Sequence, residues 1–249
     1  MADADDPLLD DIARRTAAGD RVVLVHGGGP QIDAALAERK IVGARVAGLR
    51  VTDAATLAVT ESVLCGTVNK ALVRALARRG VAAAGISGQD GMLLVARPAP
   101  AVDGVSLGFV GDVITVRPEV LHALLAANIV PVVAPLGIAE DAATAYNVNA
   151  DTAAGAIAGA LRADAYVVVT NVDRVRRDVH DAASGIERLT VREARAYLAD
   201  GTFDGGMKPK MTSALHALGA GARTAIVAGT GPGALDRALA GGGTTIVNY

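Results

Sequence analysis

The 249-residue sequence predicts an α/β protein with a mainly parallel sheet and helices on both faces of that sheet. Short β-branched runs alternate with alanine- and leucine-rich helical segments from end to end. Hydrophobic residues make up 51% of the chain and charged residues 20%, which allows a large buried core. The 29 glycines cluster between apolar runs, as expected for loops that join strands to helices. The length suits one large domain or two closely packed lobes.

Strands are predicted where a short apolar run is bounded by glycine or polar residues. These runs are Arg21–His26, Val81–Ile86, Val130–Ala134, Ala165–Thr170, Thr224–Ala228 and Thr244–Val247. We also expect a hairpin over Val105–Val116 with its turn near Gly111–Asp112, because glycine and aspartate are typical turn residues.

Helices are predicted for the segments between these strands. They are Pro30–Glu38, Ala54–Arg79, Pro118–Ala127, Asp151–Leu161, Thr190–Ala199, Met211–Gly219 and Gly233–Ala240. Pro118 suits a first helical turn. Thr190 followed by Glu193 has the spacing of a capping box. The longest segment is expected to break near Gly66, and a boundary between two α/β stretches is expected near Ala134–Asp151.

Charge and cysteine content argue against several classes of protein. The formal charge is −2 with no block of like charge, so no nucleic-acid surface is indicated. The single cysteine, Cys65, excludes an internal disulfide and a cysteine-rich metal site. No apolar run reaches the ~18 residues of a membrane span, and the acidic start is unlike a signal peptide. We therefore expect a cytoplasmic protein without a membrane partner.

A glycine loop gives the strongest local signal. In Val23–Asp33 (VLVHGGGPQID) a strand leads through Gly27, Gly28 and Gly29 into a helix that starts near Pro30. Glycine lets the backbone approach an anion closely, and the helix start adds unpaired N–H donors and a positive dipole end. The loop is suited to a phosphoryl group, although a purely structural tight turn is the alternative.

Other glycine-loop motifs fit less well. No Lys-Ser/Thr pair follows the loop, which excludes a Walker motif, and the later glycine of the dinucleotide fingerprint is missing. His-Gly-Gly-Gly also occurs as an oxyanion loop of esterases, but that reading requires a G-x-S-x-G elbow. The nearest match, Gly85–Gly88, has Gln89 in place of the final glycine.

Two polar clusters in the first part of the chain are candidate substrate contacts. Arg50 lies between Gly48 and a predicted helix cap at Asp53, and its planar fork suits a carboxylate. The alternative is an ion pair with Asp53 or a surface acid. In Tyr146–Asp151 (YNVNAD), two amides and a carboxylate alternate, which would turn all three toward one side of an extended segment. The alternative is helix capping by Asn149 or Asp151.

Two further clusters are candidate phosphate or nucleotide contacts. Thr170, Asn171 and Asp173 follow a buried strand, and ligands of open α/β sheets collect at the carboxyl ends of strands. Asp204–Lys210 (DGGMKPK) places two lysines in what we expect to be a flexible loop before a helix. A lysine there suits neutralisation of a transferring phosphoryl group. A polar turn and two surface lysines are the alternatives.

The order of these motifs resembles the acetylglutamate kinase branch of the amino-acid kinase family. The succession is HGGGPQID, GLRVTD, GTVNK, SGQDG, GFVGDV, PVVAPLG, YNVNADTAAGAIA, TNVD and GGMKPK, from about Arg21 to the end. The resemblance implies a three-layer αβα sandwich as one domain over residues 1–249. Its N-lobe, about 1–145, would bind the acyl amino acid, and its C-lobe, 146–249, would bind ATP. The implied reaction phosphorylates the side-chain carboxylate of N-acetyl-L-glutamate, a step of arginine biosynthesis.

The resemblance also implies residue roles. Gly28 and Gly29 would donate backbone N–H groups to the transferring phosphoryl group, and Arg50 would bind the substrate's α-carboxylate. Asn147 and Asn149 would hold its amide or carboxylate. Mg²⁺ would be held through the nucleotide phosphates rather than by protein ligands.

In phosphoryl transfer from the nucleotide, Lys210 would stabilise the transition state and Asp151 would orient the lysines. The implied nucleotide-binding residues are Thr170, Asn171, Asp173, Arg174, Arg176, Gly206, Met207 and Lys210. Such roles suit phosphoryl transfer, which depends on positioning and charge neutralisation rather than a protein nucleophile.

The sequence departs from the family pattern in four places. The family opens with a lysine-bearing strand, whereas Pro7–Arg15 already matches its first helix and no lysine precedes Lys40. Our hypothesis is that the natural start lies upstream of Met1. Asn171–Arg174 replaces the family's Asp-Val-x-Gly, and Lys208 replaces an apolar residue. An extra N-terminal helix of arginine-inhibited hexamers is missing, so we expect a homodimer.

Two alternatives to an active acetylglutamate kinase stay open. One is a kinase for carrier-protein-linked aminoadipate or glutamate. The other is a catalytically silent binding or regulatory protein on the same fold, which the missing lysine alone supports.

Overall fold

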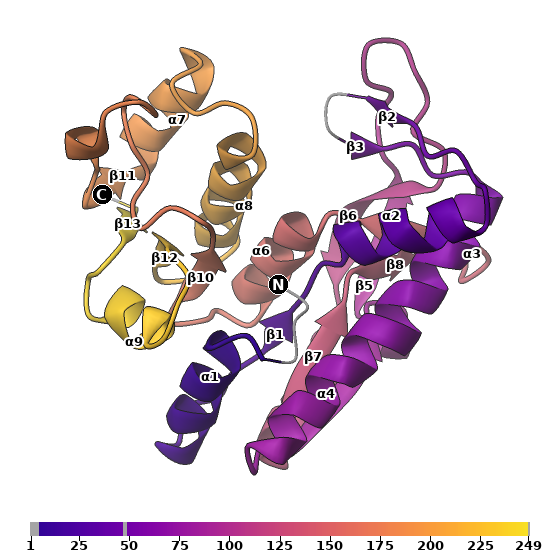
Figure 1. Ribbon diagram of the computed structural model, residues 1–249, viewed down its shortest axis with the longest axis horizontal. Coiled ribbons are helices and arrows are strands. Elements are labelled where there is room, and N and C mark those ends of the chain that lie inside the picture. The colour runs from indigo at the N-terminus through magenta and orange to yellow at the C-terminus, as the bar shows by residue number, and fades with distance from the viewer. Residues whose placement is uncertain (1–4, 47–48, 249) are drawn as a thin grey trace. The chain divides into compact units, whose positions relative to one another are not determined.

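The computed structural model describes residues 5–46 and 49–248 (Figure 1). The chain forms two compact units. The N-terminal unit comprises Met1–Asp6 and Arg15–Ala153, and the C-terminal unit comprises Pro7–Arg14 and Ala154–Tyr249. Helix α1 (Leu8–Ala17) therefore contributes residues to both units.

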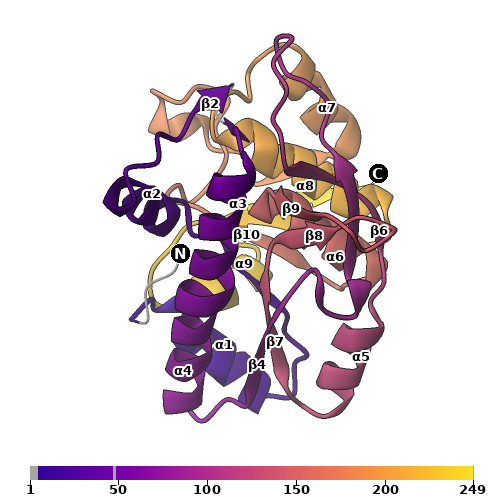
Figure 2. The same cartoon turned by 90° about the vertical axis from the view of Figure 1, so that its right-hand side faces the viewer.

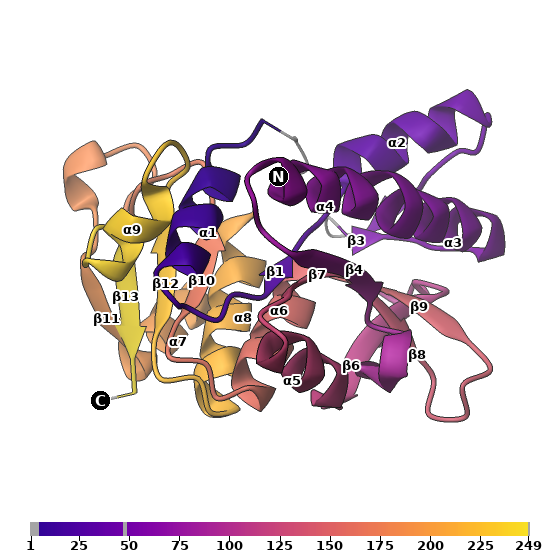
Figure 3. The same cartoon turned by 90° about the horizontal axis from the view of Figure 1, so that it is seen from below.

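The central sheet of the N-terminal unit is parallel, with strand order β1-β7-β4. These strands are β1 (Leu24–Val25), β7 (Val130–Ala134) and β4 (Ala83–Ser87). All five residues of β7 are buried, as expected for a central parallel strand. The unit's helices include α2 (Gly29–Glu38) and α5 (Glu119–Ala126). Helix α4 (Asn69–Arg78) covers one face of the sheet and α5 the other (Figure 3).

The helix predicted to break near Gly66 does not break there but changes its type. Helix α3 (Ala54–Glu61) continues through a π-helix at Ser62–Val68 into α4, and Figure 2 shows them end to end. Asp53 caps α3 by accepting a hydrogen bond from the Thr56 amide at 2.7 Å. π-Helical turns are rare and frequently lie at functional sites.

A second set of strands in the N-terminal unit forms a small closed barrel of order β5-β6-β9-β8. The strands are β5 (Leu94–Pro98), β6 (Val110–Val116), β8 (Leu136–Ile138) and β9 (Ala145–Val148). Strands β2 (Arg45–Val46) and β3 (Leu49–Arg50) form a separate antiparallel pair.

The predicted hairpin with a turn at Gly111–Asp112 is wrong, because both residues lie inside β6 and pair with Pro98 and Arg97 of β5. Gly111 serves close packing rather than a turn. A Cβ at this position would lie 2.6 Å from the Cβ of Tyr146.

The C-terminal unit has a four-stranded sheet of order β10-β12-β13-β11, in which only the β12–β13 pair is antiparallel. The strands are β10 (Tyr166–Val169), β11 (Arg188–Thr190), β12 (Ala225–Ala228) and β13 (Thr244–Val247). The helices are α6 (Ala150–Ala160, which starts in the N-terminal unit), α7 (Val191–Ala199), α8 (Met207–Gly219) and α9 (Ala234–Leu239). Thr190 and Glu193 form the predicted capping box of α7. Two short 3₁₀ turns, Asp90–Met92 and Ala182–Ser184, complete the described elements of the chain.

Side chains of β12 alternate between the two faces of this sheet. Ala225 and Val227 belong to the larger core with Met211 of α8, whereas Ile226 packs with Ala238 of α9. Each unit therefore has helices against both faces of a mainly parallel sheet, which confirms the predicted fold class.

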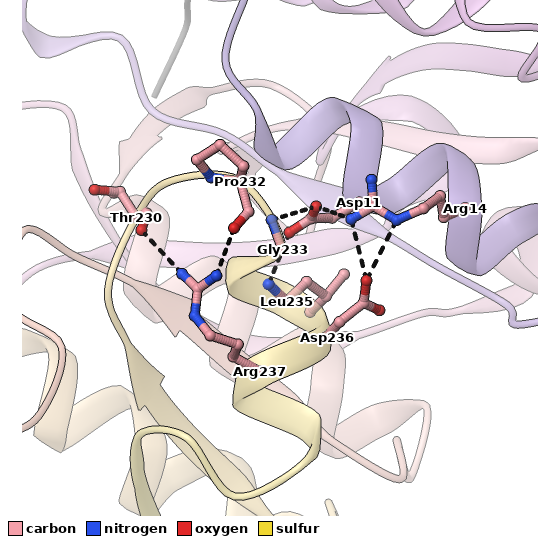
Figure 4. Close-up of polar contacts among 8 residues, drawn as sticks. All are labelled: Asp11, Arg14, Thr230, Pro232, Gly233, Leu235, Asp236 and Arg237. Carbon is pink, nitrogen blue, oxygen red and sulfur yellow. Dashed lines mark hydrogen bonds and ion pairs between the residues drawn. The ribbon is translucent and has the colours of Figure 1, made fainter.

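Helix α1 is attached to the C-terminal unit through a buried carboxylate (Figure 4). Asp11 is fully buried and accepts hydrogen bonds from the amides of Gly233 and Leu235, each at 2.9 Å. Arg14 contacts Asp11 and lies 3.1 Å from Asp236. Two N–H donors and a guanidinium compensate the cost of burying the Asp11 charge.

Among the described residues, no helix is both long and apolar enough to cross a membrane.

Candidate active site

The glycine loop has the geometry that the sequence predicts. The loop follows β1, with Gly28 as N-cap of α2, Gly29 as its first residue and Pro30 in its first turn. The first amides of this ten-residue helix have no intrahelical acceptor, so they are available to an anion. A Cβ on Gly28 would lie 2.8 Å from Cδ2 of Leu64, so a larger residue at this position would displace that side chain of the π-helix.

The start of α6 lies beside the glycine loop. A Cβ on Gly27 would be 3.8 Å from the Cβ of Ala150, the first residue of α6. The loop is therefore adjacent to the turn that carries Asn149 and Asp151.

The prediction that Asn147, Asn149 and Asp151 project from one side of an extended segment is wrong. The chain leaves β9 after Val148 and becomes helical at Ala150, which changes the side-chain direction. Oδ1 of Asn149 accepts a hydrogen bond from the Thr152 amide at 3.0 Å, so Asn149 caps α6 as the alternative interpretation proposed. Asp151 lies in the first turn of α6.

Arg50 is held in a buried position by an acidic partner. Its side chain is 7% exposed, and Nη2 lies 2.7 Å from Oδ1 of Asp33 in α2. Arg45 contacts the other oxygen of Asp33 at 2.9 Å. Burial acts to raise the pKa of Asp33, but the hydrogen bonds and charges of Arg50 and Arg45 outweigh it and lower that pKa. The partner is thus Asp33 rather than Asp53, while Gly48 lies outside the described residues.

A threonine that the sequence analysis missed connects Arg50 with Asn147. Thr52 is fully buried, and its hydroxyl donates to the Arg50 carbonyl at 3.2 Å. The same hydroxyl accepts from Nδ2 of Asn147 at 3.2 Å. Thr52 stands in the GLRVTD motif itself, two residues after Arg50, which was the available signal. Arg50 and Asn147 therefore belong to one hydrogen-bonded group in the N-terminal unit.

The two lysines of GGMKPK are helical, which corrects the predicted flexible loop. Helix α8 begins at Met207 with Gly206 as N-cap, so Lys208 and Lys210 lie in its first turn. Pro209 is compatible with this position, since a first-turn residue needs no N–H donor.

A buried hydrogen-bond chain anchors this turn of α8. Tyr166 Oη and Ser213 Oγ lie 3.0 Å apart, and Ser213 Oγ donates to the Lys210 carbonyl at 2.8 Å. Ser213 is 3% exposed. The backbone of Lys210 is therefore fixed to β10 through two side chains.

The predicted nucleotide residues between positions 170 and 176 follow β10 in exposed or half-buried positions. Thr170 donates from its hydroxyl to Oδ1 of Asn171 at 3.3 Å, and Arg176 donates to the Val179 carbonyl at 3.3 Å. Arg174 lies 2.8 Å from Glu187.

A shallow depression of about 450 Å³ in the C-terminal unit includes two of the predicted residues. Its lining consists of Asp173, Arg174, Arg237 and Gly242. Arg237 and Gly242 were not predicted, because they lie far along the chain in a stretch without a recognisable motif.

No cluster of three or more His, Cys, Asp or Glu residues suited to a metal ion occurs within residues 5–46 and 49–248.

Comparison with known proteins assigns the family. The amino acid kinase family matches residues 1–229. An acetylglutamate kinase of Methanopyrus kandleri is 46% identical over 241 residues, covering 96% of this chain and 94% of that protein. One of Gluconobacter oxydans is 44% identical over 226 residues, covering 87% and 75%. The chain belongs to the amino acid kinase family.

Solved structures agree with this assignment. N-acetylglutamate synthase of Neisseria gonorrhoeae, complexed with coenzyme A and N-acetyl-glutamate, gives a TM-score of 0.79 at 26% identity. The match covers 98% of this chain and 55% of the synthase chain.

Proposed function

We propose that this protein transfers the γ-phosphoryl group of ATP to the side-chain carboxylate of N-acetyl-L-glutamate, a step of arginine biosynthesis. The observation that carries the proposal is the 46% identity to an acetylglutamate kinase over almost the full length of both chains. A biosynthetic kinase of this type uses Mg·ATP, and we expect it to act in the cytoplasm.

The N-terminal unit supplies groups suited to the acyl amino acid. Arg50 is buried and already bound to a carboxylate, Asp33, so its environment supports binding of the substrate's α-carboxylate. Asn147 is fixed through Thr52 and can hold the substrate's amide. The amides of Gly28 and Gly29 at the start of α2 suit the transferring phosphoryl group, and Asn149 and Asp151 complete the adjacent turn.

The C-terminal unit supplies groups suited to the nucleotide. Lys210 lies in the first turn of α8, where its charge and the helix dipole both favour phosphate oxygens. Thr170, Asn171, Asp173, Arg174, Arg176, Gly206 and Met207 are proposed to contact the rest of the nucleotide. Mg²⁺ bound to the phosphates would neutralise their charge.

Trapping of the product tests the proposal. The purified protein is incubated with Mg·ATP, hydroxylamine and one acceptor at a time, and the hydroxamate formed from an acyl phosphate is measured. We expect hydroxamate with N-acetyl-L-glutamate but not with L-glutamate, which lacks the acetyl group. Hydroxamate only with a carrier-protein-linked aminoadipate would favour the second kinase class. Binding of both ligands without any acyl phosphate would indicate the silent protein instead.

A homodimer is also proposed, from the family resemblance. Light scattering after size exclusion should give twice the mass of one chain, and a monomer or a hexamer would contradict it.

A further inference from the structure

One buried amide side chain contacts two strands of the β1-β7-β4 sheet and the residue that follows the third strand. Asn69, at the start of α4, is 1% exposed. Its Nδ2 lies 2.8 Å from the carbonyl of Val132 in β7 and 3.3 Å from that of Ile86 in β4. The same nitrogen is 3.1 Å from Nε2 of His26, which directly follows β1. His26 is also 1% exposed and immediately precedes the glycine loop.

The two strand carbonyls determine which way the Asn69 amide points. A carbonyl oxygen can only accept a hydrogen bond, so the NH₂ group must face Val132 and Ile86. The reversed amide would place oxygen against oxygen at 2.8 Å. Oδ1 instead faces Gly85, where an added Cβ would lie 1.8 Å away, and it has no partner among the described residues.

The amide orientation in turn assigns the proton on His26. An amide nitrogen cannot accept a hydrogen bond, so Nε2 at 3.1 Å from Nδ2 of Asn69 must be the acceptor, sharing the two amide hydrogens with the Val132 and Ile86 carbonyls. The proton of the neutral ring is therefore on Nδ1. Nδ1–H then donates to the Gly27 carbonyl at 2.9 Å. Burial lowers the pKa of His26, opposed in part by the Gly27 carbonyl, so the ring is neutral near pH 7.

The Gly27 carbonyl and the Gly28 N–H belong to the same peptide group. The chain has no cis peptide bond among its described residues, so the two groups point in opposite directions across a plane. We propose that Asn69 and His26 are positioning residues that hold the Gly27 carbonyl and thereby direct the Gly28 N–H toward the phosphoryl group. The expected effect on catalysis rests on the proposed function, whereas the hydrogen bonds of Asn69 and His26 do not depend on that function.

Nitrogen NMR of the histidine ring tests the hydrogen bonds without any turnover. In the native protein near pH 7, we expect Nδ1 of His26 to carry the proton and Nε2 to be unprotonated. The Gly28 amide resonance should move in Asn69→Leu and His26→Gln but not in Thr60→Val. Thr60 is a suitable control because it is fully buried and its hydroxyl has no partner among the described residues. A protonated Nε2, or an unmoved Gly28 resonance, would overturn the proposal.

Kinetic measurements test the expected effect of these two residues on catalysis. The side-chain nitrogen of His26→Asn can replace the donor Nδ1, because both are attached to Cγ. The side-chain amide of His26→Gln lies one bond further out, near the position of Nε2, where its oxygen can accept from Asn69 but no donor reaches the Gly27 carbonyl. We expect kcat to fall about 10- to 100-fold in His26→Gln and Asn69→Leu, with KM for N-acetyl-L-glutamate nearly unchanged. His26→Asn and Thr60→Val should stay within about threefold of the native kcat.

Equal losses in His26→Asn and His26→Gln would refute positioning through Nδ1. A native protein that makes no acyl phosphate would refute the proposed function, while the NMR result would still decide whether the hydrogen bonds exist.

Discussion

The candidate residues of the two units differ in how firmly they are held. In the N-terminal unit, Arg50, Thr52, His26 and Asn69 are all buried and hydrogen-bonded to one another or to strand carbonyls. In the C-terminal unit, the Arg174–Glu187 pair has side chains that are 39% and 71% exposed. Hydrogen bonds shielded from water hold a geometry, whereas exposed ion pairs contribute little. We infer that the acyl amino acid meets a preformed site and the nucleotide a more adaptable surface.

Among the candidate residues of the C-terminal unit, Lys210 has a backbone that a buried hydrogen bond holds in place. Its replacement should have the largest effect on kcat. We expect Lys210→Ala to lower kcat about 10²- to 10³-fold, because a charge directed at the phosphoryl group is lost. Nucleotide binding measured by calorimetry should weaken much less than kcat. Lys208→Ala, in the same helical turn, is the control and should change kcat less than threefold or so. Equal losses in both variants would mean that only the overall positive charge matters.

Arg50→Ala should mainly weaken binding of the acyl amino acid. We expect KM for N-acetyl-L-glutamate to rise about 10- to 100-fold, with KM for ATP unchanged, because a buried charge-assisted contact disappears. Arg45→Ala provides a matched control, since Arg45 binds the same Asp33 from an exposed position. If Arg45→Ala raised this KM as much as Arg50→Ala does, the assigned role of Arg50 would be wrong.

The fold of the C-terminal unit should depend on buried contacts far more than on exposed ones. Tyr166→Phe removes the hydroxyl that contacts Ser213 and should lower the free energy of unfolding by about 1 kcal/mol. Arg174→Ala should change it by less than about 0.5 kcal/mol. Urea titrations of both variants measure the free energy of unfolding. A larger decrease in Arg174→Ala than in Tyr166→Phe would contradict the greater importance of buried contacts.

The buried neutral His26 should make stability depend on pH. Burial places its folded-state pKa below the ordinary value of 6.5. As the pH falls below 6.5, the unfolded chain binds a proton that the folded chain does not, so the free energy of unfolding decreases. The decrease is at most about 1.4 kcal/mol per pH unit, and no such effect is expected above pH 7 or so. The difference between the urea midpoints at pH 7.5 and pH 5.5 should be smaller in His26→Asn than in the native protein. An unchanged difference would exclude His26 as the source of the pH dependence.

The sequence predicted most of what depends on local chemistry. Strands such as β7 and β12 follow from continuous apolar runs, and the capping box of α7 follows from Thr190 and Glu193. The glycine loop was predictable because strand, glycines and helix start are adjacent in the chain.

Features that depend on long-range packing were not predictable. Gly111 resembles a turn residue, yet it is required by the side chain of Tyr146, which lies distant in sequence. Asn69 and Thr52 acquire their roles from strands that pack around them. Helix α8 was predicted to begin at Met211 but begins at Met207, because a first turn accepts the proline at position 209.

Isotope transfer tests most directly whether the side-chain carboxylate is the phosphoryl acceptor. N-acetyl-L-glutamate labelled with ¹⁸O in both side-chain carboxylate oxygens is incubated with the protein, Mg·ATP and hydroxylamine. Hydroxylamine attacks the carbonyl carbon of an acyl phosphate, so the released phosphate keeps the bridging oxygen. We predict that ³¹P NMR will show phosphate containing one ¹⁸O atom. Phosphate without label would show that water, and not the carboxylate, received the phosphoryl group, which would contradict the proposed function.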